Sequence, residues 1–214
     1  MIVQDTAWDG YEEIPAWIMQ GYGTMAMEAG EQLKEYGCER PTHIFVQAGV
    51  GSLAGAVVGY YSNLFADNPP TFVVVEAEAA ACLYKGAAAG DGDIRIVDGD
   101  METIMAGLAC GEPNTISWDI LKNHVKVFIA APDWVAANGM RMLGAPIKGD
   151  APVTSGESGA APFGALAAVM TMDEYKDLRN DIGLDASSKV LLFSTEGDTD
   201  PDRYKNIVWK GLDK

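Results

Sequence analysis

The spacing of apolar residues predicts helices that alternate with short buried strands. From residue 14 to residue 36, apolar side chains recur at nearly helical intervals with few helix breakers, which predicts a long helix ending near Gly37. Residues 43–47 and 71–75 are runs of β-branched or aromatic side chains bounded by glycine, proline or polar residues, as is typical of buried strands. Residues 52–65, between the two strands, form a segment long enough for a crossover helix. The two strands and this helix predict a β-α-β unit with parallel strands.

The rest of the chain continues this alternation. We expect one further helix to end at Gly86. Neither an internal repeat nor a low-complexity linker interrupts the sequence, so we expect residues 1–214 to form a single α/β domain. The predicted helices cover residues 77–85, 118–123, 132–143 and 161–170, with a helical turn within 103–109, and the predicted strands cover 94–97, 125–130 and 189–193.

The net charge of the chain restricts its partners. At −16 it argues against nucleic acid or an anionic membrane as a main partner, because both would be repelled. The longest apolar runs are far shorter than the roughly 20 residues of a membrane span, and Met1 leads into the sequence without a basic, signal-like segment. We therefore expect a soluble cytoplasmic protein.

Cysteine and histidine spacing gives no metal-binding pattern. The three cysteines, Cys38, Cys82 and Cys110, have no CxxC spacing, and the only histidines are His43 and His124. The usual zinc motifs are absent, and we expect no protein-bound metal. Cys82 and Cys110 both lie near glycines and are candidates for a disulfide, whereas buried free thiols are the commoner state in a cytosolic chain.

The most informative segment is a strand that runs through closely spaced glycines into a helix. Residues 43–55 read His-Ile-Phe-Val-Gln-Ala-Gly-Val-Gly-Ser-Leu-Ala-Gly. Such a turn leaves backbone N–H groups unpaired at the positive end of the helix dipole, which suits a phosphate. Glycines allow close approach of the backbone to the phosphate and permit positive φ. The residues that we expect at the phosphate are Ala48, Gly49, Val50, Gly51 and Ser52.

The glycine loop taken alone leaves three interpretations open. It fits the G-x-G-x-x-G/A dinucleotide fingerprint, and Glu76 ends the next strand where a ribose-binding acid lies, which favours an NAD-type oxidoreductase domain. A Walker-type loop is disfavoured because no Lys-Ser or Lys-Thr follows the glycines. The other interpretations are a glycine turn that only packs a helix against its sheet and a non-catalytic module for phosphate-ligand binding or assembly.

Two sets of sequence strings narrow this choice through a family resemblance. Residues 192–200, Leu-Phe-Ser-Thr-Glu-Gly-Asp-Thr-Asp, resemble the S-x-x-G-D-x-D strand end of tryptophan synthase β chains, which are fold-type II pyridoxal-phosphate enzymes. Residues 4–8, 14–22, 103–114 and 155–160 resemble diaminopropionate ammonia-lyases, in the same order along nearly the whole chain. The resemblance implies a three-layer α/β fold with a mostly parallel sheet and flanking helices, the large domain of that family.

The resemblance also implies an activity. Its members bind pyridoxal 5'-phosphate, act as homodimers, and convert the amino acid 2,3-diaminopropionate to pyruvate and ammonia by β-elimination. Backbone amides of residues 49–52 and the Ser52 hydroxyl would hold the phosphate, and Ser194 or Thr195 would offer a neutral hydroxyl to the pyridine nitrogen. Asp5 would be an acid-base or substrate-amine-binding carboxylate, and Glu157 is a second candidate near the cofactor.

Each of these side chains also has an ordinary structural interpretation. Asp5 could cap a helix or stabilise a turn. Acid-base work by its carboxyl requires partial burial, for which Ala7 and Trp8 are the neighbouring apolar residues. Ser194 could end its strand with a local backbone hydrogen bond, and Glu157 could cap a helix.

The chain lacks the lysine that binds the cofactor covalently in this family. That lysine lies far upstream of the glycine loop, whereas here Lys34 is the only lysine before Ala48 and has an unrelated context. The chain therefore resembles the carboxy-terminal portion of the lyase, as a separate fragment, one half of a split protein or a degenerate relative. We expect no lyase activity from the chain alone, and weak binding of the cofactor through its phosphate.

Overall fold

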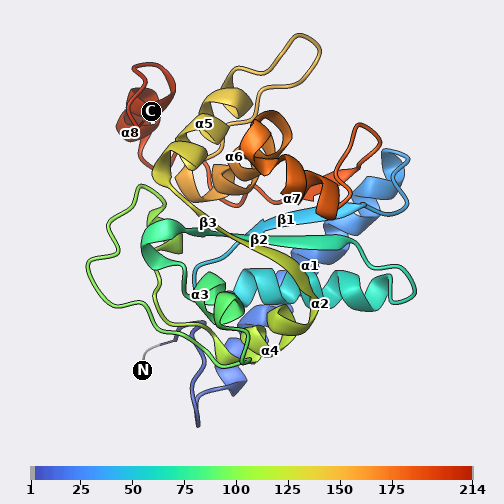
Figure 1. Ribbon diagram of the computed structural model, residues 1–214, viewed down its shortest axis with the longest axis vertical. Coiled ribbons are helices and arrows are strands. Elements are labelled where there is room, and N and C mark those ends of the chain that lie inside the picture. Colours follow the sequence, from blue (N-terminus) through green and yellow to red (C-terminus); the bar gives the residue numbers. More distant parts are fainter. Residues whose placement is uncertain (1–2, 214) are drawn as a thin grey trace.

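The computed structural model describes residues 3–213 and has one parallel sheet covered by helices on both faces (Figure 1). This confirms the predicted α/β class. In chain order the main elements are α1 (Glu13–Glu35), β1 (His43–Gln47), α2 (Ser52–Leu64), β2 (Thr71–Ala77), α3 (Cys82–Ala89), α4 (Thr115–His124), β3 (Val125–Ala131), α5 (Asp133–Gly144), α6 (Glu157–Thr171), α7 (Lys176–Asp181), β4 (Val190–Leu192) and α8 (Pro201–Val208). Single 3₁₀ turns occur at Glu78–Ala80, Ala106–Leu108 and Asp173–Tyr175.

The strand order places the ends of β1 and β4 side by side. The sheet runs β3-β2-β1-β4, and every pair of neighbours is parallel. All five residues of β1 are buried because this strand has a neighbour on each side and helices above and below. Parallel strands bring their carboxyl ends to one edge of the sheet, where ligands bind in open α/β folds. The glycine loop after β1 and the segment after β4 therefore meet there.

Alternate side chains of the central strands enter two apolar layers. Phe45 and Val73 point into the layer formed mainly by α5 and α6, whereas Ile44 and Val74 point into the layer with α1, α2 and α4. Figure 1 shows these two groups of helices on opposite sides of the sheet. Continuous apolar runs are what a parallel sheet buried on both faces requires, which explains the sequence pattern of these strands.

Two predictions of secondary structure are wrong. Gly86 does not end a helix: α3 continues to Ala89 and stops at Gly90, which has a φ of +71°. Gly86 instead allows a close helix contact, because a Cβ there would lie 3.0 Å from the ring of Trp118. Residues 94–97 do not form a strand, because no neighbouring strand pairs with them. The Val97 N–H donates one hydrogen bond to the Gly111 carbonyl, 2.9 Å away.

Other helices differ from the prediction in their extent. Helix α6 begins at Glu157, before the predicted residue 161, and α4 begins at Thr115, before residue 118. Helices α7 and α8 were not predicted, although α8 has a recognisable start: the Asp200 side chain accepts a hydrogen bond from Arg203 N, and Pro201 is the first residue of the helix.

Two further expectations concern membranes and disulfides. Among the helices of residues 3–213, none is both long enough and apolar enough to span a bilayer. Cys38, Cys82 and Cys110 are free thiols, so the alternative of a Cys82–Cys110 disulfide is not realised.

Candidate functional site

A cavity of about 330 Å³ lies at the edge where β1 and β4 end. Four separate parts of the chain form its wall: the amino-terminal segment with α1, the glycine loop, the turn at Ala106–Leu108, and the segment after β4 with the start of α6. Its lining residues are Asp5, Tyr22, Gln47, Gly49, Val50, Gly51, Ser52, Leu53, Gly107, Leu108, Cys110, Ser158, Thr195 and Glu196. A larger cavity of about 570 Å³ lies along β3, α3 and α6, but mainly apolar side chains line it and the glycine loop is not part of it.

The glycine loop has the geometry of an anion site. Gly51 has a φ of +99° and directly precedes α2, whose first residue is Ser52. Within residues 3–213, the N–H groups of Gly49, Gly51 and Ser52 have no hydrogen-bond acceptor. Unpaired N–H groups at a helix start carry partial positive charge and bind phosphate or carboxylate. A side chain at Gly51 is excluded, because a Cβ would lie 2.7 Å from Ser117 Oγ.

The Ser52 hydroxyl is engaged by protein atoms. It donates a hydrogen bond to the Asp5 carbonyl at 3.0 Å and accepts one from Asn114 Nδ2 at 2.9 Å. Its side chain is buried. The predicted phosphate contact at this position therefore falls to the backbone N–H, while the hydroxyl connects the loop to the amino-terminal segment.

Asn114 is a residue whose importance the sequence interpretation missed. It is completely buried, and its side-chain oxygen accepts from Ile116 N and Ser117 N, which caps α4. Its Nδ2 donates to the Asp5 carbonyl at 2.6 Å, and its N–H donates to the Val50 carbonyl at 2.7 Å. The capping role had a sequence signal, an Asn just before a helix, whereas the contacts with the loop had none.

The Asp5 carboxylate lies in the cavity beside two other polar groups. It raises the pKa of Tyr22 and of the Cys110 thiol, in each case after the larger effect of burial. Helix α1 has Glu12 at its N-cap, so Asp5 does not cap that helix. Trp8 is exposed and stacks on Tyr11, so it does not supply the expected apolar surroundings.

The two hydroxyls after β4 have different environments. Thr195 lines the cavity, and its Oγ1 accepts a hydrogen bond from Gln47 Nε2 at 3.0 Å. Ser194 is not among the lining residues, and its hydroxyl donates to Ser155 Oγ at 2.8 Å. Of the two hydroxyls proposed for the pyridine nitrogen, Thr195 is therefore the one that faces the cavity.

Glu196, rather than Glu157, lies at the cavity. Its Oε2 accepts from the N–H groups of Ser158 and Gly159 at 2.6 and 3.2 Å, so it caps the start of α6. Glu157 is not a lining residue and pairs with Arg203 of α8 at 3.3 Å. Burial raises the pKa of the Glu157 carboxyl. The structure thus places the capping role on a carboxylate that the sequence interpretation had not singled out.

Glu76 does not have the position that a ribose-binding acid needs. Its carboxylate is buried and accepts hydrogen bonds from Leu83 N and Tyr84 N at the start of α3, 2.9 and 2.6 Å away. Burial raises its pKa to about 7, although these N–H groups oppose the rise. Both carboxylate oxygens accept hydrogen bonds from α3. The dinucleotide interpretation therefore lacks the free carboxylate that would bind the ribose.

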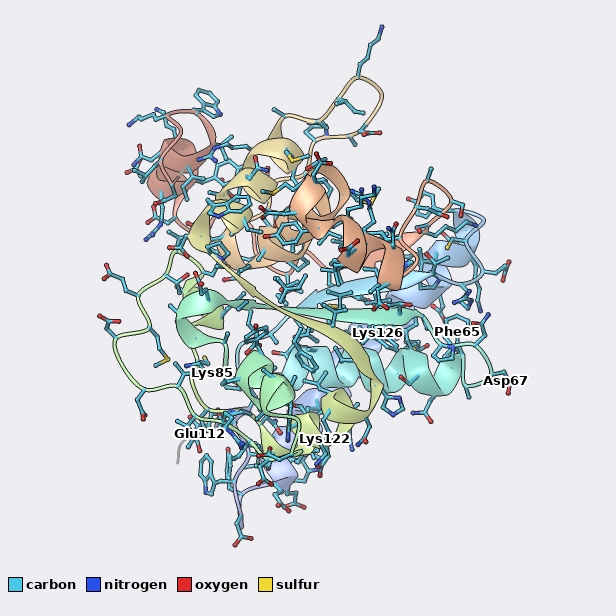
Figure 2. All side chains as sticks on the ribbon, viewed as in Figure 1. Phe65, Asp67, Lys85, Glu112, Lys122 and Lys126 are labelled. Atoms are coloured by element: carbon cyan, nitrogen blue, oxygen red, sulfur yellow. The ribbon has the colours of Figure 1, made fainter. Side chains whose placement is uncertain are left out.

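The described lysines all lie outside the wall of the cavity. Lys34 is on α1 and lines a separate hollow against α2. Figure 2 labels Lys85, Lys122 and Lys126, which project from α3, α4 and β3 and line two other hollows. No cluster of potential metal ligands occurs among residues 3–213. Polar groups that could bind a ligand therefore line the cavity, but no described lysine that could bond to it covalently does.

Comparison with known proteins identifies the family. The profile described as "Pyridoxal-phosphate dependent enzyme" matches residues 7–191. Diaminopropionate ammonia-lyase of Salmonella typhimurium is 56% identical over 212 residues, and that of Escherichia coli K12 is 50% identical over 210 residues. These matches cover 99% and 98% of this chain and 52% of each relative, so the chain spans about half the length of these relatives.

A solved structure gives the same result. The E. coli diaminopropionate ammonia lyase in complex with an aminoacrylate-PLP azomethine reaction intermediate superposes with a TM-score of 0.91 and 47% identity. That match covers 99% of this chain and 53% of the other. The extent of the profile match and the agreement in fold show that the chain belongs to the family of pyridoxal-phosphate dependent enzymes.

Proposed function

We propose that this chain is the cofactor-binding, carboxy-terminal portion of a diaminopropionate ammonia-lyase. The observation that carries the proposal is that one cavity joins the unpaired N–H groups of the glycine loop, the Thr195 hydroxyl and the Asp5 carboxylate. These are an anion site, a neutral hydrogen-bond donor and a proton carrier. Pyridoxal phosphate and an amino-acid substrate need these three groups.

The residues present fit pyridoxal phosphate. A cavity of about 330 Å³ is within the range of small-ligand sites, which begins at roughly 300 Å³. Gly49 keeps this end of the cavity open, because a Cβ there would lie 3.2 Å from the Gly107 carbonyl and 3.4 Å from Cys110, two residues of the cavity wall. In addition, Gln47 Oε1 is buried without a hydrogen-bond partner, and an orphaned acceptor of this kind at a cavity wall is typical of a binding site.

Each group has a definite task in the proposed reaction. The cofactor, when bound, supplies the electron sink that makes loss of the α-proton feasible. The N–H groups of Gly49, Gly51 and Ser52 hold the phosphate, and the Thr195 hydroxyl donates a hydrogen bond to the ring nitrogen. Asp5 holds the substrate amine or moves a proton at the substrate. The overall reaction is β-elimination of 2,3-diaminopropionate to pyruvate and ammonia.

The remaining machinery has to come from outside these residues. No lysine of residues 3–213 lines the cavity, so the amine that bonds to the cofactor belongs to another part of the protein or to another chain. The match to only about half of each relative supports this interpretation. The proposed partners are the missing portion of the lyase and, in the complete enzyme, a second copy of it.

A binding experiment tests the proposal. Titration of the purified chain with pyridoxal phosphate should quench tryptophan fluorescence reversibly, inorganic phosphate should compete, and borohydride should fix no covalent adduct. Gly51→Ala should abolish binding, because the new Cβ would lie 2.7 Å from Ser117 Oγ at a positive φ.

Gly59→Ala, on the helix that follows Gly51, is the matched control. Its Cβ would lie 3.7 Å from the nearest atom, an ordinary contact, so this variant should bind pyridoxal phosphate like the unsubstituted chain. Affinity for NAD without affinity for pyridoxal phosphate would contradict the proposal.

A further inference from the structure

Gln47 forms a side-chain bridge where the β1–β4 ladder has ended. The paired residues of these strands stop at Phe45 and Leu192. Beyond this point β1 continues along β2 as far as Gln47 before the glycine loop begins, and the chain after β4 turns toward α6. Gln47 reaches across this gap, because its Nε2 donates to the Phe193 carbonyl at 2.8 Å and to Thr195 Oγ1 at 3.0 Å.

The bridge determines which way the Thr195 hydroxyl points. A hydroxyl has one hydrogen to donate, and here its oxygen accepts the hydrogen bond from Gln47. Within the described part of the chain, the Thr195 hydroxyl has no acceptor for that hydrogen. The side chain is exposed and lines the cavity. Its hydrogen is therefore available to an acceptor atom on a ligand.

The other half of the Gln47 carboxamide supports a role in ligand binding. Oε1 is buried and has no hydrogen-bond partner among residues 3–213, although Gln47 is only 2% exposed. Folding selects against unpaired buried acceptors, because each lost its hydrogen bonds to water when the chain folded. Nε2 thus makes both hydrogen bonds of this carboxamide, in a residue that lines the cavity.

We propose that Gln47 is a positioning residue that sets the distance and polarity between the two ends of the cavity. It holds the Thr195 hydroxyl at a fixed separation from the glycine loop. The cavity then selects a rigid ligand with a phosphate at one end and a hydrogen-bond acceptor at the other. This inference rests on the proposed function, in which that ligand is pyridoxal phosphate.

The test compares a ligand that spans the cavity with one that fills only its phosphate end. Calorimetric titrations of the purified chain use pyridoxal phosphate and inorganic phosphate. Gln47→Met keeps the length of the side chain and removes both donors. Because the Thr195 hydroxyl would no longer be held toward the ligand, pyridoxal phosphate should lose one hydrogen bond and bind about tenfold more weakly. Inorganic phosphate touches only the loop, so its affinity should change less than about twofold by the same reasoning.

Further variants separate positioning from a general structural effect. Thr195→Val keeps the shape of an exposed side chain and should reproduce the loss of selectivity, even if Gln47→Met does not fold. The double variant should be no worse than either single variant, because both remove the same hydrogen bond to the ligand. Gln32→Met, at an exposed position on α1, is the control and should bind both ligands like the unsubstituted chain.

The outcomes distinguish the inference from the proposed function. If the unsubstituted chain fails to bind pyridoxal phosphate, both are overturned. If it binds, but Gln47→Met weakens both ligands equally or neither of them, only the role of Gln47 is overturned. Additive losses in the double variant would likewise show that Gln47 and Thr195 act separately.

Discussion

In the proposed function, the two ends of the cavity bind the ligand through different kinds of atoms. At the β1 end the donors are backbone N–H groups of the glycine loop, and their positions follow from φ at Gly51 and the start of α2. At the β4 end the donor is the Thr195 side chain, which Gln47 orients from another strand. The loop is therefore sensitive to side chains that are added, whereas the β4 end is sensitive to side chains that are removed.

The helices that begin at the two ends of the cavity also differ. Helix α2 begins with no side-chain cap, so its N–H groups remain free for a ligand. Helix α6 begins beside the same cavity, but the Glu196 carboxylate already occupies its N–H groups. One helix start is thus open to an anion and the other is closed by the chain itself. The cavity consequently has one anion site.

The largest expected effect is on catalysis, because the proposed cofactor site has hydrogen-bonding groups at both ends but no lysine amine. The purified chain, supplied with pyridoxal phosphate and 2,3-diaminopropionate, should form no pyruvate in an assay coupled to lactate dehydrogenase. Co-expression with a portion of the lyase that carries the lysine should restore pyruvate formation. Turnover by the chain alone would show that a group inside it replaces that lysine.

The next largest expected effect is on the pH dependence of stability, through the buried carboxyl of Glu76 at the end of β2. Its pKa is raised from 4.5 to about 7 by burial, so the folded chain binds this proton more tightly than the unfolded chain does. The stabilisation is therefore complete below pH 4.5 and is lost as pH rises through 7. The free energy of unfolding should fall by about 3 kcal/mol across this interval, on the order of 1.4 kcal/mol per pKa unit.

Urea denaturation at several pH values measures this dependence, with Glu76→Gln as the comparison. The glutamine variant lacks the titrating proton, so the difference between the two curves isolates Glu76 from the other acidic groups. Parallel curves for the two proteins would contradict a raised pKa at this residue.

A smaller effect should separate the two glutamates at the start of α6. Glu196→Ala removes the partner of two buried N–H groups and should lower the free energy of unfolding by about 1–2 kcal/mol. Glu157→Gln breaks only an ion pair with Arg203, whose side chain is 44% exposed, and should lower it by about 0.5 kcal/mol. Denaturant titration of both variants gives the comparison, and a reversed order would refute the assignment of the cap to Glu196.

The sequence was most informative where structure is local. Residues 43–47 and 52–65 were predicted to within one residue of β1 and α2, because β-branched side chains, glycines and helical spacing act within a few positions. Asp5, and Thr195 as the alternative to Ser194, were proposed from short unbroken strings, and both line the cavity. The prediction of a strand at 94–97 was wrong because strand formation is not local: a strand requires a neighbouring strand, which its own residues do not specify.

The residues missed at the site owe their roles to long-range contacts. Gln47 bonds to atoms 146 and 148 positions away, and Asn114 bonds to Asp5 across 109 positions. Glu196 reaches the start of α6 across 38 positions. No local pattern encodes such distances. A polar residue at the end of a strand or before a helix looks the same whether or not another segment folds against it.

The bond from the Asn114 N–H to the Val50 carbonyl has a thermodynamic consequence for ligand binding. Together with the hydrogen bond from the Gly55 N–H to the Gly51 carbonyl, it ties the glycine loop to its neighbours before any ligand arrives. The entropy of ordering the loop is therefore lost during folding and not during association. An anion that entered the loop would find its donors already converged, so the hydrogen bonds that hold the folded loop would also favour the binding of that anion.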